Sequence, residues 1–356
     1  MRNIFSSCIF KNILTFFIGS FLFQDGFAQN NVKRKFAVPN LKEVPSEIAF
    51  GSCLNEKGKL EVLSSVENSG ADLFLLLGDN VYADTINEKK LRRSYRTLKS
   101  SEEYTSLSSK IPVLGIWDDH DYGINDGGSE HPEKEMSQRV FQDFFNVPKD
   151  SPLRQRKGVY SSYMFRKGDK SLKLILLDTR YFRSKLTKRL NKKGKTYYVK
   201  DSSPEATVLG SAQWAWLEEE LKKPSTVTVV ASSIQVLSNE HRFEKWDNFP
   251  LERKRLLELL ENGPSKVNVI LSGDRHFSEV SKYISKKGRS IYEITSSGLN
   301  RGAFFGKYED HKYRIDYLGG DSFAKLSIDW KKDLPKVTGK LFGSDGKVKK
   351  NIEFKF

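Results

Sequence analysis

Short apolar runs that alternate with helix-like segments restrict the fold of this chain more than any other feature. The runs are rich in Leu, Ile and Val and lie at 47–53, 72–79, 111–119, 172–180, 226–235 and 266–274. Segments with helical periodicity lie between them, at 58–69, 87–99, 133–146, 211–222 and 250–262. Continuous apolar strands separated by helices indicate a sheet that is covered on both faces. The pattern therefore predicts a layered α/β fold.

The last part of the chain has a different pattern. It contains four further strand-like runs, at 290–298, 322–330, 336–342 and 347–356, with a turn before the last one. We expect these runs to form antiparallel strands. Because the sequence has no internal repeat and no long linker, we predict a single domain over 47–356, preceded by a short lead-in at 29–46.

The first 28 residues have the pattern of a secretory signal. Arg2 and Lys11 precede an apolar run of 11 residues at 13–23, and small residues follow it, ending at Ala28. The run is too short to span a bilayer, so we expect export to the periplasm or the extracellular space, with cleavage after Ala28. An uncleaved N-terminal anchor is the alternative. Cleavage would leave Cys53 as the only cysteine of the mature chain.

The composition excludes several classes of protein. With 38% hydrophobic and 29% charged residues, the chain is neither a polytopic membrane protein nor a disordered tail. Its 60 Lys and Arg outnumber 45 Asp and Glu, and residues 183–200 carry eight of these basic residues and no acid. This basic segment is either a solvated loop or a rim that steers polyanionic substrates toward a nearby site.

Polar side chains able to bind metal or phosphate follow nearly every apolar run. They are Cys53, Asp79, Asn80, Tyr82, Asp118, Asp119, His120, Asp121, Asp178, Arg180, Gln235, Asp274 and His276. In layered α/β proteins the carboxyl ends of the strands meet at one crevice, where ligands bind. Several carboxylates brought together repel one another unless cations neutralise them. The sequence therefore predicts a site that binds metal ions.

The spacing within the motifs sharpens this prediction. Asp79 directly follows an apolar strand, where its carboxylate can bridge two cations, and Tyr82 can return to the same site as a phenolate. Asp274 and His276 are two residues apart and point the same way on an extended chain. Phenolate, thiolate and carboxylate suit a hard trivalent ion, whereas carboxylate and amide oxygens suit Ca²⁺ or Mn²⁺. Two such ions can clamp a phosphoryl group for in-line displacement.

Five motifs in this order resemble the alkaline phosphatase D (PhoD-like) family of the metallophosphatase superfamily, which is related to purple acid phosphatases. They are GSC at 51–53, GDNVY at 78–82, WDDHD at 117–121, LDTR at 177–180 and SGDRH at 272–276. The resemblance covers roughly residues 47–300. It implies an α/β sandwich of four layers, with two central mixed β-sheets flanked by helices. It also implies a centre that contains Fe³⁺ and Ca²⁺, with Mn or Zn as substitutes.

The resemblance also implies individual roles for the site residues. The iron ligands would be Cys53, Asp79, Tyr82 and Asp274, with Asp79 bridging to calcium, and the calcium side would be completed by Asp119 and His276. His120 would protonate the leaving oxygen, and Arg180 would hold the substrate phosphate. Asn80, expected to bind substrate, and Asp118 and Gln235 would lie near the site.

These residues predict a secreted, metal-dependent alkaline phosphatase that hydrolyses phosphate monoesters, diesters or both, with a metal-bound hydroxide as nucleophile. One alternative within this class is a phosphodiesterase or phospholipase D-like hydrolase of polyanionic or lipid phosphodiesters. Another class is a non-enzymatic basic protein that binds anions, and a third is a thiol enzyme with Cys53 as nucleophile. The oligomeric state is left open by the sequence.

Several of these residues have a purely structural alternative. Cys53 could instead be a small buried apolar residue, and Arg180 could instead be the ion-pair partner of a neighbouring carboxylate. Asp79 and Asp274 could cap turns. Three other histidines, at positions 131, 241 and 311, and the tryptophans at 214 and 216 lack a motif and are expected to be packing or surface residues.

Overall fold

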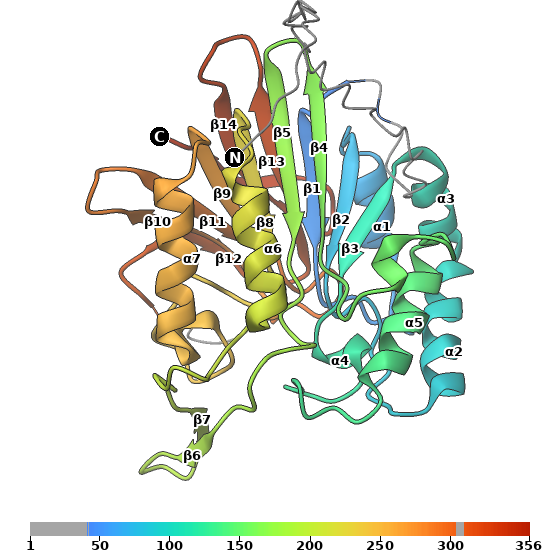
Figure 1. The fold of residues 1–356 in the computed structure, drawn as a ribbon. Helices are drawn as coiled ribbons and strands as arrows, with labels where there is room; N and C mark the ends of the chain where they lie inside the picture. Colours follow the sequence, from blue (N-terminus) through green and yellow to red (C-terminus); the bar gives the residue numbers. More distant parts are fainter. Residues whose placement is uncertain (1–40, 42, 304–309) are drawn as a thin grey trace, which may run out of the picture. The chain divides into compact units, whose positions relative to one another are not determined.

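Two β-sheets form the centre of the fold in the computed structural model, which describes residues 41, 43–303 and 310–356 (Figure 1). The first sheet has six strands in the order β15-β14-β13-β1-β2-β3. Its parallel half consists of β1 (Glu47–Gly51), β2 (Leu73–Leu77) and β3 (Val113–Ile116). Its antiparallel half consists of β13 (Ser322–Asp329), β14 (Lys336–Gly343) and β15 (Val348–Glu353).

The second sheet has seven strands in the order β12-β10-β11-β9-β8-β5-β4. Its parallel strands are β5 (Lys170–Leu176), β8 (Val227–Ala231), β9 (Val267–Ser272) and β11 (Ser290–Thr295). The antiparallel strands are β4 (Ser161–Lys167), β10 (Ser278–Ile284) and β12 (Arg314–Leu318). A separate hairpin of β6 (Lys188–Leu190) and β7 (Thr196–Tyr198) lies in the basic segment.

The two sheets pack face to face and share one apolar core. Leu73, Leu75 and Leu77 of β2 belong to this core together with Val229 of β8 and Val269 of β9. Side chains alternate between the two faces of a strand, so every second residue of these continuous apolar runs points away from the core. The outward residues need a second cover, which explains why the strands are apolar throughout.

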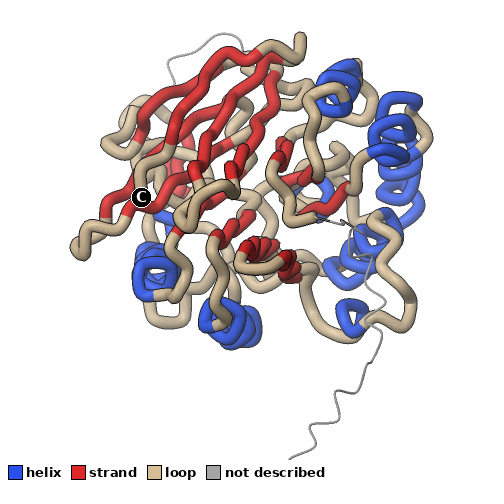
Figure 2. Tube along the Cα trace, turned by 90° about the horizontal axis from the view of Figure 1, so that it is seen from above, coloured by secondary structure: helices blue, strands red, loops and turns tan. Residues whose placement is uncertain are grey.

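Helices provide that cover on both outer faces, as Figures 1 and 2 show. The first sheet packs against α1 (Glu61–Glu67), α2 (Glu88–Lys99), α3 (Glu102–Lys110) and α5 (Lys134–Phe144). The second sheet packs against α6 (Gly210–Lys222) and α7 (Pro250–Asn262). The order helix, sheet, sheet, helix confirms the predicted four-layer α/β sandwich.

Every strand and helix predicted from periodicity is present, but the pairing of one strand differs. The run at 290–298 was expected to be antiparallel, whereas β11 pairs in parallel with β9 and antiparallel only with β10. The pattern also fails to reveal α3, β4, β10 and β12. In β4 exposed or half-exposed positions separate the buried ones, in β10 they follow four buried ones, and β12 has no buried position, so these strands lack the continuous apolar run that marks the central strands.

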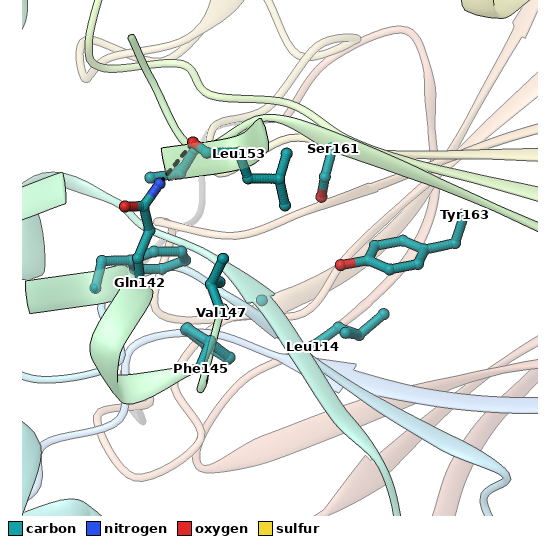
Figure 3. A pocket seen from close by; sticks show the side chains of 10 residues that line it. Leu114, Gln142, Phe145, Val147, Leu153, Ser161 and Tyr163 are labelled. Atoms are coloured by element: carbon teal, nitrogen blue, oxygen red, sulfur yellow. Dashed lines mark hydrogen bonds between the residues drawn. The ribbon is translucent and has the colours of Figure 1, made fainter. Parts of the chain in front are cut away.

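A small apolar cavity of about 40 Å³ lies where the edge strands β3 and β4 of the two sheets meet α5 (Figure 3). Leu114, Phe145 and Tyr163 are among its lining residues, and Gln142 closes one side by donating to the carbonyl of Leu153 at 2.9 Å. None of the predicted metal ligands lines it. The cavity is therefore a feature of the packing at the edge of the sandwich.

Two predictions about the N-terminus concern residues outside the described part of the chain. These are the signal segment at 1–28 and most of the lead-in at 29–46, of which residues 41 and 43–46 are described. Among the described residues, no helix has both the length and the apolar character needed to cross a membrane.

Candidate metal centre

The predicted ligands lie at the carboxyl ends of strands from both sheets. Cys53 follows β1, Asp79 follows β2 and Asp274 follows β9. Ser52, just after β1, forms a parallel bridge with Ser297, just after β11, and this bridge joins the two sheets at this end. The sandwich thus brings the motifs of both halves of the chain to one place.

Four of the predicted ligands have an unusual backbone conformation. Cys53, Asp79, Asp274 and His276 have φ values of 59°, 49°, 69° and 57°, in the left-handed region. Non-glycine residues rarely adopt this conformation, which costs on the order of 1–3 kcal/mol each and persists only where the surrounding structure enforces it. Its concentration at these positions indicates that the backbone is shaped to aim the side chains into the site.

Asp79 lies at the centre of the cluster. Its carboxylate belongs to three groups whose potential ligand atoms lie within 4.8 Å of one another. The first group is Cys53, Asp79 and His276, the second is Asp79, Asp119 and His120, and the third is Asp79, Asp118, Asp119 and Asp274. A carboxylate shared by overlapping groups is suited to bridge two cations.

Tyr82 also reaches the cluster. Its hydroxyl donates to Oδ2 of Asp79 at 3.2 Å and lies 3.3 Å from Nε2 of His276. The Cys53 thiol lies 3.3 Å from the same Oδ2 of Asp79. All six predicted metal ligands are therefore brought together. The grouping itself differs from the one implied by the resemblance, because His276 lies with Cys53, and Asp274 lies with the carboxylates of 118 and 119.

Burial makes this cluster electrostatically unfavourable on its own. Asp79 is 1% exposed, and burial together with the neighbouring Cys53 and Asp119 raises its pKa well above the usual range. Burial, Asp118 and Asp119 likewise raise the pKa of Asp274, and burial raises the pKa of the Cys53 thiol. Cations would offset this repulsion, so the donor set fits metal ions.

His276 has the protonation state that metal binding needs. Burial and the nearby Arg301 lower its pKa to about 4, so the imidazole is neutral at physiological pH. A neutral imidazole can offer a ring nitrogen to a metal ion. Arg301 itself is exposed and lies 4.1 Å from the centre of the Tyr82 ring.

His120 lies on the short helix α4 (Asp119–Tyr122), directly after β3. Its Nδ1 is 2.6 Å from Oδ1 of Asp84, and its ring packs at 4.2 Å from the ring of Tyr82. Burial disfavours the charged imidazole, but Asp84 and Asp119 outweigh this effect and raise its pKa. The side chain thus lies at the edge of the cluster with one ring nitrogen engaged by a carboxylate.

Comparison with known proteins agrees with this geometry. The sequence profile described as PhoD-like phosphatase matches residues 48–321, which contain every motif of the cluster. This chain belongs to the PhoD-like phosphatase family.

Alkaline phosphatase D of Bacillus subtilis (strain 168) is 24% identical over 297 residues. The match covers 72% of this chain and 49% of that protein, so the chain spans about half the length of this curated relative. A solved structure of PhoD has a TM-score of 0.66 at 17% identity, over 88% of this chain and 72% of that one. A purple acid phosphatase from yellow lupin (Lupinus luteus) has a TM-score of 0.63 at 12% identity, over 88% and 54%. At these identities the structural matches establish the fold.

Arg180 forms buried ion pairs of the kind named as the alternative to phosphate binding. Its guanidinium is fully buried and contacts Asp118 at 2.5 Å and Glu244 at 2.5 Å. Glu244 also pairs with the buried Arg183 at 2.8 Å. The guanidinium stands behind the carboxylate of Asp118, which belongs to one of the metal-binding groups. In this PhoD-like chain, Arg180 therefore forms an ion pair with one carboxylate of the candidate metal centre.

The side chains of three other predicted site residues form hydrogen bonds that hold parts of the fold together. Asn80 is fully buried, and its amide nitrogen donates to the Ile116 carbonyl at 2.8 Å and to Asp121 at 2.6 Å. Asp121 also accepts from the Tyr95 hydroxyl at 2.9 Å, which together ties the ends of β2 and β3 to α2. The carboxylate of Asp178 accepts from the Trp117 indole and from three backbone amides, those of residues 159, 180 and 181.

Gln235 is not in any of the metal-binding groups. Its amide nitrogen donates to Thr295 at 2.8 Å and to Glu279, and its oxygen lies 3.1 Å from His241. Glu279 also contacts His311 at 3.1 Å. Gln235 belongs to this separate buried network, and both histidines have the packing role expected for them.

Sequence reasoning missed three residues around the centre. Asp84, Glu244 and Arg301 lie outside the motifs that follow apolar strands. Asp84 could have been recognised, because it is an acidic residue two positions after the GDNVY motif. Glu244 and Arg301 lie in loops whose path depends on the tertiary structure, so no local pattern could have identified them.

Proposed function

We propose that this protein is a metal-dependent phosphoric ester hydrolase. The observation that carries this proposal is the position of Asp79, whose carboxylate is shared by three groups of potential metal ligands. Membership of the PhoD-like phosphatase family supports the same reaction class. The proposal extends to monoesters and diesters, since a two-metal site can act on either.

For the metals, we propose iron and calcium, with Mn or Zn as substitutes. Cys53 and Tyr82 supply thiolate and phenolate, which suit a trivalent ion, while Asp119 supplies a carboxylate that suits calcium. Asp79 would bridge the two positions. The remaining ligands would be Asp274 and His276. When bound, the cations would supply an activated water and offset charge on the phosphoryl oxygens.

In this mechanism, His120 acts as the general acid. Its Nδ1 is engaged by Asp84 at 2.6 Å, which leaves Nε2 to donate a proton to the leaving oxygen. Asp84 holds the imidazole in orientation and favours its protonated form. Because His120 is grouped with Asp79 and Asp119, the proton it carries is close to where the ester would bind. Neither a serine nor the cysteine is needed as nucleophile.

We assign phosphate contact to Arg301 in preference to Arg180. Arg180 is fully buried between two carboxylates, so its guanidinium is already used. Arg301 is exposed and lies over the ring of Tyr82, at the border of the cluster. An exposed guanidinium in this position can bind two phosphate oxygens as an ester approaches.

A polyanionic diester is the second candidate substrate. The basic segment 183–200 forms the β6–β7 hairpin, which lies at the same end of the sheets as α4 in Figure 1. The Tyr198 hydroxyl donates to the Asp126 carboxylate, and the backbone amide of Asp126 donates to Oδ2 of Asp119 at 2.6 Å. The hairpin is thus tied to a proposed ligand through a single residue, which favours steering of a polyanion toward the centre.

Metal analysis of the purified protein, combined with rates on a mono- and a bis-nitrophenyl phosphate, tests the main proposal. We expect bound iron and calcium and hydrolysis of at least one ester; a metal-free protein without activity would contradict the proposal. Neutralising Lys192, Lys193 and Lys195 with glutamine should lower kcat/KM on a polyanion at low salt. The matched control replaces three exposed lysines elsewhere, Lys286, Lys331 and Lys332, and should leave it unchanged.

We also propose that the protein is exported, that the segment 1–28 is removed after Ala28, and that 47–356 is one catalytic domain. The apolar run at 13–23 supports export. N-terminal sequencing of the protein recovered from the periplasm or the medium checks the cleavage point. A chain that still begins at residue 1 and pellets with membranes would favour the anchor instead.

A further inference from the structure

A polar pocket of about 230 Å³ lies on the side of the fold formed by α5, the 3₁₀ turn η1 (Pro152–Arg154) and the residues that follow this turn. Its lining contains four basic side chains, those of Arg139, Arg154, Arg156 and Lys157, and one acidic one. None of the proposed metal ligands lines it. The pocket is therefore separate from the metal centre.

Arg156 is the central observation. Its guanidinium lies 3.8 Å from the centre of the Tyr160 ring and 5.5 Å from that of Trp216. Its Nε and Nη2 atoms are fully buried and have no hydrogen-bond acceptor among the described residues. A buried charge without a hydrogen-bonded counter-charge costs several kcal/mol. The two aromatic rings offset part of this cost, but they leave the N–H groups unpaired.

Tyr181 lines the same pocket and supplies a second buried donor group. The residue is 2% exposed, and burial together with the nearby carboxylate of Glu135 raises the pKa of its hydroxyl. Its backbone amide is fixed by Oδ1 of Asp178 at 2.9 Å, so the ring cannot easily move away. Arg156 and Tyr181 thus bring buried donor groups to the lining of one polar cavity.

The other charges of the pocket also favour an anion. Arg154 already pairs with Asp143 at 2.8 Å. Arg139 and Lys157 are exposed and form no ion pair in the described part of the chain. The only carboxylate of the lining, that of Glu135, is exposed and leaves the lining with an excess of positive charge.

We propose that this pocket binds a tetrahedral oxyanion of the phosphate class, with Arg156 and Tyr181 as buried donors and Arg139 and Lys157 as outer cations. The volume is sufficient, since a water molecule occupies about 30 Å³ in the liquid and the pocket is several times larger. Guanidinium and phenol groups both donate to phosphate oxygens, and the fork of Arg suits two oxygens at once. The bound group is either free inorganic phosphate or the phosphate of a larger molecule.

Calorimetric titration of the metal-loaded protein with inorganic phosphate tests the proposal. We expect a phosphate site that does not compete with ester hydrolysis, in addition to any site at the metals. Arg156→Met should abolish this site and leave product inhibition of hydrolysis unchanged. The matched control, Arg93→Met, removes an exposed arginine of α2 and should leave the site intact.

Tyr181→Phe keeps the ring and removes only the hydroxyl, so it tests the pocket even where Arg156→Met impairs folding. We expect it to weaken phosphate binding at this site about tenfold, as for a hydrogen bond to a charged group. Tighter binding of a phosphomonoester than of free phosphate would identify the larger ligand. The proposal is overturned if neither variant changes the number or affinity of phosphate sites. If the protein proves to hydrolyse no ester, the pocket should still bind phosphate, so the two proposals fail separately.

Discussion

The carboxylate of Asp84 lies 2.6 Å from Nδ1 of His120. Asp84 has a φ of 42°, in the left-handed region, and its backbone amide donates to the His120 carbonyl at 3.2 Å. The two residues therefore hold each other through both side chain and backbone. Because a carboxylate on Nδ1 fixes the tautomer and the direction of the other ring nitrogen, Asp84 is a positioning residue for the proposed general acid.

Asp84→Asn should slow hydrolysis mainly for esters with poor leaving groups. The amide still occupies the space but holds the imidazolium less strongly, so proton donation to the leaving oxygen weakens. We expect kcat to fall about tenfold or more for an alkyl ester and much less for a nitrophenyl ester, which hardly needs protonation. Iron and calcium content should stay as in the native protein, as measured by elemental analysis.

A uniform loss on both esters would count against this role, because it would indicate damage to the centre as a whole. Asp169→Asn, which changes an exposed aspartate on a turn, is the matched control and should leave both rates unchanged.

Cys53→Ser should remove or exchange iron. The thiol is fully buried and lies 3.3 Å from Oδ2 of Asp79, in a group that also contains His276. A serine hydroxyl is a much poorer ligand than a thiolate, whereas a buried cysteine without a metal would tolerate this change with little consequence. We expect the iron-to-protein ratio to fall well below that of the native protein; an unchanged ratio and rate would support the purely structural alternative.

Removal of the metals should destabilise the fold. The carboxylates of Asp79, Asp118, Asp119 and Asp274 offer ligand atoms within 4.8 Å of one another, and bound cations would offset the repulsion that Arg180 leaves. A chelator should therefore lower both Tm and activity, and added calcium and iron should restore them. In Asp119→Asn, which weakens the proposed calcium side, we expect a higher calcium concentration to be needed for recovery. A Tm that does not respond to chelation would argue against a metal centre.

Arg180→Met should lower the stability of the fold, whereas Arg301→Met should weaken substrate binding. The first leaves Asp118 and Glu244 buried without their partner, which should lower the free energy of unfolding by about 3–5 kcal/mol in urea titrations. The second changes an exposed side chain, so stability should change by less than about 0.5 kcal/mol. We expect Arg301→Met to raise KM with little change in kcat. An Arg180→Met protein of native stability with a raised KM would restore the phosphate-binding interpretation of Arg180.

The sequence was sufficient for the central strands and for the convergence of the six side chains proposed as ligands. Each of these side chains follows an apolar run, and the carboxyl ends of parallel strands meet at one edge whatever the details of the loops. Asp79, which directly follows an apolar strand, was predicted to bridge two cations, and it belongs to three groups of potential ligands.

Which ligands group together, and which side chains are free to meet substrate, could not be predicted in this way. His276 lies with Cys53, and both positions adopt left-handed backbone conformations, which a period of two along an extended strand does not anticipate. The ion pairs of Arg180 could not be predicted, because Glu244, its second buried partner, comes from a loop 64 residues later. Loop paths of this kind depend on the packing of the whole domain.

The last prediction concerns Lys245, which is 3% exposed and whose ammonium group donates to the Phe243 carbonyl at 3.1 Å. Burial lowers its pKa to about 8, although the nearby Asp247 opposes the shift. In the unfolded chain its pKa is about 10.4, so between these two values the unfolded state binds more protons and stability rises with pH. Below about pH 8 the full cost of burying the charge is present. Lys245→Met keeps the length of the side chain and should raise the urea midpoint at pH 7, and the difference from the native protein should disappear above about pH 10. A variant that is less stable than the native protein at pH 7 would show that the ammonium group contributes more through its contacts than it costs through burial.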